Sequence, residues 1–75
     1  MRAEELVKKL DTLGVNANSY SLGVIKNSDC TCVVKENDLW VVYYVERDKP
    51  SMQASFVNEG DAYDFVLMQF KKWLS

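Results

Sequence analysis

The residues best suited to chemistry are the two cysteines, Cys30 and Cys32, which are separated by a single residue. On a β-strand their side chains point to the same face, a spacing that can hold a metal ion. Zinc usually takes four ligands, however, and the chain has no histidine and no further cysteine. A disulfide between the two would close a very short and strained loop. The pair is therefore predicted to be two small core residues, reduced and metal-free.

Other catalytic groups are missing or have a structural explanation. The absence of histidine removes the commonest general base and makes a Ser-His or Cys-His arrangement impossible. Asp61 and Asp64 are one helical turn apart, but at the start of a helix they complement the helix dipole. The three glycines, Gly14, Gly23 and Gly60, form no glycine-rich phosphate loop. We therefore expect no enzymatic activity, no catalytic residue and no cofactor.

Length and composition define a small domain with a core of its own. The 75 residues are predicted to form a single domain over residues 1–75. A hydrophobic content of 48% argues against disorder. No stretch approaches the ~20 apolar residues of a membrane span, and the N-terminal segment does not resemble a signal peptide. The cytoplasm is the expected compartment. The net charge of -2 makes a phosphate backbone a poor partner and a basic protein surface a better one.

Helices are predicted at the two ends of the chain. Apolar residues recur at helical spacing over residues 3–13, and Gly14 follows as a C-terminal cap. A second helix is predicted over residues 59–74, with Asn58 as its N-cap and charges that complement the dipole at both ends.

Three strands are predicted between the helices, over residues 30–35, 39–46 and 52–57, with turns at residues 36–38 and 48–51. The middle strand is the strongest, because it is rich in β-branched and aromatic residues. The predicted fold is α+β, a single two-layer domain in the order α-β-β-β-α, with a three-stranded antiparallel sheet and both helices on one face.

The connection over residues 15–28 is long for a compact domain, which leaves room for a short helical turn or an extra strand.

Strand alternation assigns each side chain to a face of the sheet. Nine residues are assigned to the face under the helices: Cys30, Cys32, Val34, Trp40, Val42, Tyr44, Met52, Ala54 and Phe56. The second helix adds Ala62, Val66, Leu67, Phe70 and Leu74 to this core. The opposite face then carries Thr31, Val33, Val41, Tyr43, Val45, Gln53 and Ser55. Its apolar members would form a contiguous patch, which often marks a contact site.

Several motifs follow one another in a characteristic order. The run from Trp40 to Asp48 precedes a strand ending in Phe56, and the acidic helix start Asp61-Ala62-Tyr63-Asp64-Phe65 comes next. Leu13-Gly14-Val15 and Tyr20-Ser21-Leu22 precede them. Together these motifs resemble small immunity proteins of bacterial polymorphic toxin systems, over about residues 6–74. The chain departs from that pattern at Val45, where a small polar residue is usual, and at Asp48, where glycine is usual. The resemblance implies a cytoplasmic antitoxin that binds and blocks a cognate toxin domain.

The predicted partner-binding residues lie on the middle strand and its two turns: Glu36, Asp38, Val41, Tyr43, Val45, Glu46, Arg47 and Asp48. Tyr43 is the expected aromatic anchor, and the charges are expected to steer the encounter. The acidic balance favours a toxin domain with a basic active-site cleft. Neither a nucleic acid nor a membrane is an expected partner, and the protein is expected to be a monomer or a weak homodimer.

Two alternatives stay open. The α-β-β-β-α order is also that of double-stranded RNA-binding domains, but Glu59, Asp61 and Asp64 at the start of the second helix would repel phosphate. The other alternative is an accessory domain that homodimerises through the face carrying Val33 and Tyr43.

Overall fold

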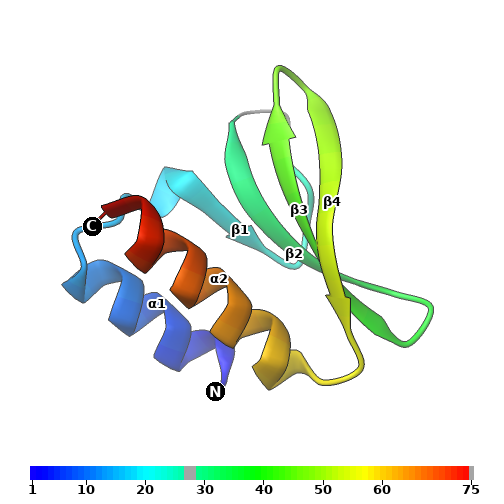
Figure 1. Cartoon of the computed structure of the whole chain (residues 1–75), viewed down its shortest axis with the longest axis horizontal. Coiled ribbons are helices and arrows are strands. Elements are labelled where there is room, and N and C mark those ends of the chain that lie inside the picture. Colours follow the sequence, from blue (N-terminus) through cyan, green and yellow to red (C-terminus); the bar gives the residue numbers. More distant parts are fainter. Residues whose placement is uncertain (27–28, 75) are drawn as a thin grey trace.

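The computed structural model describes residues 1–26 and 29–74. Its elements are α1 (Ala3–Thr12), a short 3-10 turn η1 (Ala17–Ser19), β1 (Tyr20–Leu22), β2 (Cys30–Glu36), β3 (Leu39–Glu46), β4 (Lys49–Phe56) and α2 (Glu59–Leu74), shown in Figure 1. The predicted α+β class is confirmed. The sheet, however, has four strands rather than three. The segment 15–28 supplies both the helical turn and the additional strand, and its last two residues lie outside the described part of the chain.

The additional strand makes the sheet mixed. The strand order is β1-β2-β3-β4, with β1 parallel to β2 and the other neighbours antiparallel. Tyr20 pairs with Thr31, and the N–H of Gly23 donates to the carbonyl of Val33 at 2.7 Å, just beyond the end of β1. Because parallel neighbours must be joined by a crossover, residues 23–29 have to return the chain to the start of β2.

Both hairpins close with two-residue turns. Asn37 and Asp38 have φ values of 47° and 67°, and Arg47 and Asp48 have 52° and 64°. Positive φ at both central residues is the signature of type I′ turns, whose twist matches that of the flanking strands. The second turn therefore comes earlier than residues 48–51, and β4 begins at Lys49 rather than at Met52.

The register of the first hairpin reverses the predicted faces of β2. Lys35 pairs with Trp40 and Val33 pairs with Val42, and residues paired in this way share a face. Trp40, Val42 and Tyr44 face the helices as predicted, so Thr31 and Val33 do too. Cys30, Cys32 and Val34 lie on the opposite face, and their predicted place under the helices was wrong.

A β-bulge changes which side chains of β4 face the helices, so the predicted place of Met52 under the helices was wrong. Val42 pairs with Ala54 but Tyr43 pairs with Met52, so Gln53 is an extra residue in β4. A bulge of this kind shifts the alternation by one residue. Ala54 therefore shares the helix side with Val42, whereas Met52 lies on the other side and is 64% exposed.

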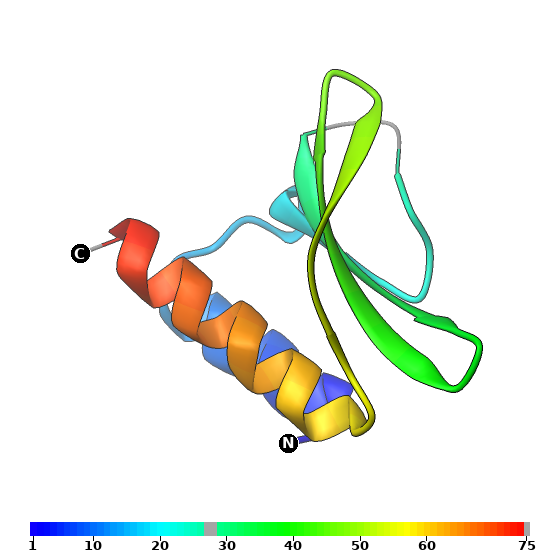
Figure 2. The ribbon, with the colours of Figure 1, turned by 45° about the vertical axis from the view of Figure 1, so that its right-hand side comes forward.

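The helices lie side by side on one side of the sheet and run in the same direction, as Figures 1 and 2 show. The first helix ends in a Schellman motif, in which Gly14 (φ 82°) donates to Asp11 and Val15 donates to Leu10. No helix in residues 1–26 and 29–74 is long and apolar enough to cross a membrane.

The main core fills the space between the helices and the sheet. Its buried members are Leu6, Leu10, Tyr20, Val33, Val42, Ala62, Tyr63, Val66, Leu67 and Phe70. Edge-to-face aromatic contacts add to it, with Tyr20 and Phe70 at 6.5 Å between ring centroids. Leu74, predicted to join the core, is 56% exposed at the end of α2.

Candidate interaction surface

The face of the sheet away from the helices, called the outer face from here on, does not carry the predicted apolar patch. Val33 lies on the helix side, and Val41 and Val45 are on the outer face but only 4% and 0% exposed. The chain leaving β1 runs along this side of the sheet, away from the helices (Figure 2). A crossover of this kind is required by the parallel pairing of β1 with β2, which the three-stranded prediction did not include.

Small side chains are buried on the outer face. Cys30, Cys32 and Val45 form a second buried cluster, with Tyr43 packed against it, and the two thiol Sγ atoms are 3.4 Å apart. At this separation the two sulfur atoms are not joined in a disulfide. The N–H of Arg47 donates to Oδ1 of Asp29 at 3.0 Å, which ties the start of β2 to the β3–β4 turn. In the described part of the chain, no three potential metal ligands come together.

Tyr43 is the predicted anchor that remains accessible. Its ring is half-buried, and its hydroxyl donates to Oε2 of Glu36 at 2.7 Å. This hydrogen bond raises the pKa of Tyr43, and desolvation and the Glu36 charge raise it further. Tyr43 pairs with Cys32, four residues before Glu36, so its ring lies lengthwise along the strands. The hydrogen bond therefore holds the aromatic ring in one orientation.

Two exposed apolar side chains belong to the same outer face. Leu39 pairs with Glu36 and is 38% exposed, and Met52 pairs with Tyr43 and is 64% exposed. Together with Glu36 and Tyr43 they form what we call the Tyr43 surface. Neither Leu39 nor Met52 was predicted to be part of a site, because the position of the bulge and the length of the turn decide their exposure.

The predicted charged residues do not come together. Glu36 and Asp38 lie at one end of β3, and Glu46, Arg47 and Asp48 lie at the other, all exposed. Eight residues of extended strand separate the two groups by roughly 23 Å. A small partner can reach only one of them. Asp38 is next to the Tyr43 surface, whereas Glu46 is not.

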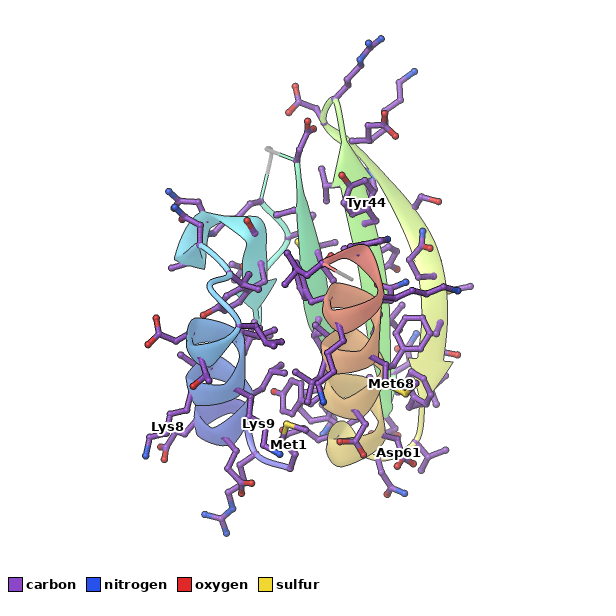
Figure 3. All side chains as sticks on the ribbon, turned by 60° about the vertical axis from the view of Figure 1, so that its left-hand side comes forward. Met1, Lys8, Lys9, Tyr44, Asp61 and Met68 are labelled. Carbon is purple, nitrogen blue, oxygen red and sulfur yellow. The ribbon has the colours of Figure 1, made fainter. Side chains whose placement is uncertain are left out.

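A second concave region lies on the helix side, where the β3–β4 hairpin extends past α2 (Figures 1 and 3). It consists of a hollow of about 890 Å³ on α2 and one of about 430 Å³ on the hairpin. The lining residues are Phe65, Met68, Gln69, Lys71, Lys72 and Trp73 from α2, and Tyr44, Glu46, Arg47, Lys49, Ser51 and Gln53 from the hairpin. We call this region the α2–hairpin groove.

Aromatic contacts join the two parts of the groove. The rings of Tyr44 and Trp73 meet edge to face at 5.9 Å between centroids, and Phe65 contacts Phe56 of β4 at 5.6 Å. Sequence reasoning missed this region, since it depends on how far the hairpin extends beyond the helix. One signal was present: Met68 and Trp73 are large apolar residues on the side of α2 that the core does not use.

No protein-family model matches this chain, and no curated protein or solved structure shows significant similarity to it.

Proposed function

We propose that this protein is an immunity protein that binds a cognate bacterial toxin domain by direct contact and inhibits it. The sequence motifs described above motivate the toxin partner. The observation that supports direct binding is the Tyr43–Glu36 hydrogen bond, which holds an accessible aromatic ring in place before any partner arrives. A pre-ordered aromatic side chain loses little conformational entropy on binding, and aromatic residues dominate the energy of many interfaces.

The proposed interface is the Tyr43 surface together with Asp38. Its charge is acidic, which suits a toxin domain whose active-site cleft is basic. Val41 and Val45 act in this proposal as the buried support beneath Tyr43 and not as contacts, because both are covered. Glu46, Arg47 and Asp48 would contribute only to a partner that spans the length of β3.

Two observations weigh against the alternatives. A homodimer through the predicted apolar face loses much of its basis, because Val41 and Val45 are buried and Val33 points toward the helices. A double-stranded RNA-binding domain would have three strands and a basic start to its second helix. Here the sheet has four strands, and α2 begins with Glu59 and Asp61.

The test is binding to the protein encoded beside this one, followed by rescue of growth when the two are produced together. Tyr43→Ala should speed dissociation at least about tenfold, since a hot-spot side chain is lost. Reversal of Glu36 and Asp38 to Lys should mainly slow association and change its salt dependence. The matched controls are Tyr44→Ala, on the other face of the sheet, and reversal of Glu4 and Glu5 on α1.

The outcomes separate the interface from the function. If no neighbouring gene product binds, the immunity function is refuted. If the toxin binds but the Tyr43 and Glu36 variants behave like the parent, the interface lies elsewhere on the molecule.

A further inference from the structure

The α2–hairpin groove combines exposed apolar side chains with a concave shape. Met68 is 71% exposed and Trp73 is 53% exposed, and both line the larger hollow. Met68 lies on the side of α2 toward β4, and Tyr44 lies above the C-terminal end of the helix (Figure 3). Large apolar side chains that line a hollow are typical of sites that receive an apolar group from a partner.

The charge of the groove is opposite to that of the chain. Its lining contains four cationic residues, Arg47, Lys49, Lys71 and Lys72, and one acidic residue, Glu46. The balance is 4 − 1 = +3, in a chain whose net charge is -2, so the rest of the molecule carries −2 − 3 = −5. Lys71 and Lys72 line the apolar hollow itself, whereas Arg47 and Lys49 line the neighbouring hollow on the hairpin together with Glu46. Both parts of the groove are therefore positively charged, and such rims attract carboxylates.

We propose that the α2–hairpin groove binds an acidic peptide segment of another protein, with a bulky apolar side chain of that segment in the hollow lined by Phe65, Met68 and Trp73. Carboxylates on either side of this anchor meet Lys71 and Lys72 at one rim and Arg47 and Lys49 at the other. The groove lies on the opposite side of the sheet from the Tyr43 surface, so this site is independent of the proposed toxin interface.

The shape favours a peptide over a membrane surface. A bilayer is broad and needs apolar side chains that project from a convex surface, whereas Met68 and Trp73 line a hollow. A peptide segment can place one side chain in that hollow and its charges at the rims.

The test uses Trp73 as a built-in reporter. In a Trp40→Phe background Trp73 is the sole tryptophan. Three short synthetic peptides are titrated: one rich in Glu that carries Phe and Leu, one with Lys in place of Glu, and one with Ser in place of Phe and Leu. We expect a saturable change in Trp73 fluorescence with the first peptide alone, and weaker binding as salt rises.

Matched variants locate the binding site. Lys71→Glu and Met68→Gln should each weaken binding of the Glu-rich apolar peptide about tenfold, because one loses a rim charge and the other an apolar contact. Arg2→Glu makes the same charge change outside the groove, and Val57→Gln removes an apolar side chain that is 75% exposed elsewhere. Both controls should bind like the parent.

Several outcomes would overturn the proposal. These are binding of the Lys-rich or Ser-containing peptide with equal affinity, unchanged affinity in Lys71→Glu and Met68→Gln, or a Trp73 response only to phosphatidylserine vesicles. A dimer detected by sedimentation, with a second copy of the chain in the groove, would also overturn it. Because the assay uses no toxin, its result leaves the proposed immunity function to be decided separately.

Discussion

The two faces of the sheet are covered in different ways. On the helix side, α1 and α2 pack large side chains against Val33 and Val42, and the cover is regular. On the outer face, Cys30, Cys32 and Val45, which are smaller, form a separate buried cluster. The chain that leaves β1 runs along this side of the sheet (Figure 2). Small side chains allow a backbone to approach closely, but a single segment cannot cover four strands. The side of the outer face nearest β4 therefore keeps Tyr43 and Met52 accessible. The proposed binding surface is the part of this face that the rest of the chain leaves exposed.

The largest expected effects compare Val42 with Val45, which lie on opposite faces of β3 and are both 0% exposed. Val42→Ala should lower the free energy of unfolding by about 2–3 kcal/mol, since the packed helices cannot close the cavity. Val45→Ala should cost about 1–2 kcal/mol, since the outer face is not packed against the two helices and its small side chains can settle into the space. Denaturant unfolding of both variants measures the difference. Equal losses would show that the two covers are equally rigid.

A smaller effect is expected inside the outer-face cluster. Cys32→Ser places a hydroxyl at a fully buried position, where the Cys30 thiol at 3.4 Å is its described neighbour. We expect a loss of about 1–2 kcal/mol in the free energy of unfolding, because a hydroxyl is desolvated without a strong acceptor. Cys32→Ala is the control for size. A serine variant as stable as the alanine variant would mean that water reaches this cluster.

The next change should stabilise the protein slightly. Thr31 faces the helices at 1% exposure, and its Oγ1 atom has no hydrogen-bond partner among the described residues. Thr31→Val keeps the shape and removes the desolvated hydroxyl, so the free energy of unfolding should stay equal or rise by up to about 1 kcal/mol. Thermal and denaturant unfolding check this expectation. A clear loss of stability would show that Thr31 makes a hydrogen bond after all, and that the helix side is less dry than its burial indicates.

The smallest effect concerns alkaline pH at the outer face. The pKa of Tyr43 is raised by its hydrogen bond to Glu36, so folding favours the protonated phenol. This contribution is fully present below the unfolded-state pKa of about 10 and is lost as pH rises through the higher folded-state pKa. Tyr43→Phe should make the alkaline fall in stability less steep in denaturant unfolding measured on both sides of that pH.

A second tyrosine provides the comparison on the helix side. Burial and the nearby Glu59 raise the pKa of Tyr63. Tyr63→Phe should therefore also make the free energy of unfolding fall less steeply as the pH rises. If the free energy of unfolding of Tyr43→Phe falls with alkaline pH as steeply as that of the parent, the Tyr43–Glu36 hydrogen bond does not persist in solution.

The helices and the middle strand could be predicted because local signals determine them. Helical spacing and Gly14 gave α1, and the β-branched run gave β3. The faces of β2 and β4 depend instead on single-residue details, namely a two-residue turn at Asn37–Asp38 and the extra residue Gln53. Since strand periodicity is two, each such detail reverses a face.

The site was harder to predict than the fold. Val41 and Val45 have the composition of an exposed patch, yet both are buried, and the parallel strand β1 was not part of the three-stranded prediction. Tyr43 was predicted on the correct face because β3 was aligned correctly. The α2–hairpin groove depends on the relative lengths of α2 and the β3–β4 hairpin, which no local pattern encodes.

The parallel pairing of β1 with β2 also determines the order in which the strands of the sheet form during folding. Two-residue turns join β2, β3 and β4, so these strands can meet quickly, whereas β1 has a place to dock only after β2 is in position. By the same logic β1 should open first in the native protein, and the amides of Ser21 and Leu22 should exchange with solvent early. Such an opening would briefly expose Cys30 and Cys32 to solvent. The rate at which a thiol reagent labels them would then measure this local opening and not global unfolding.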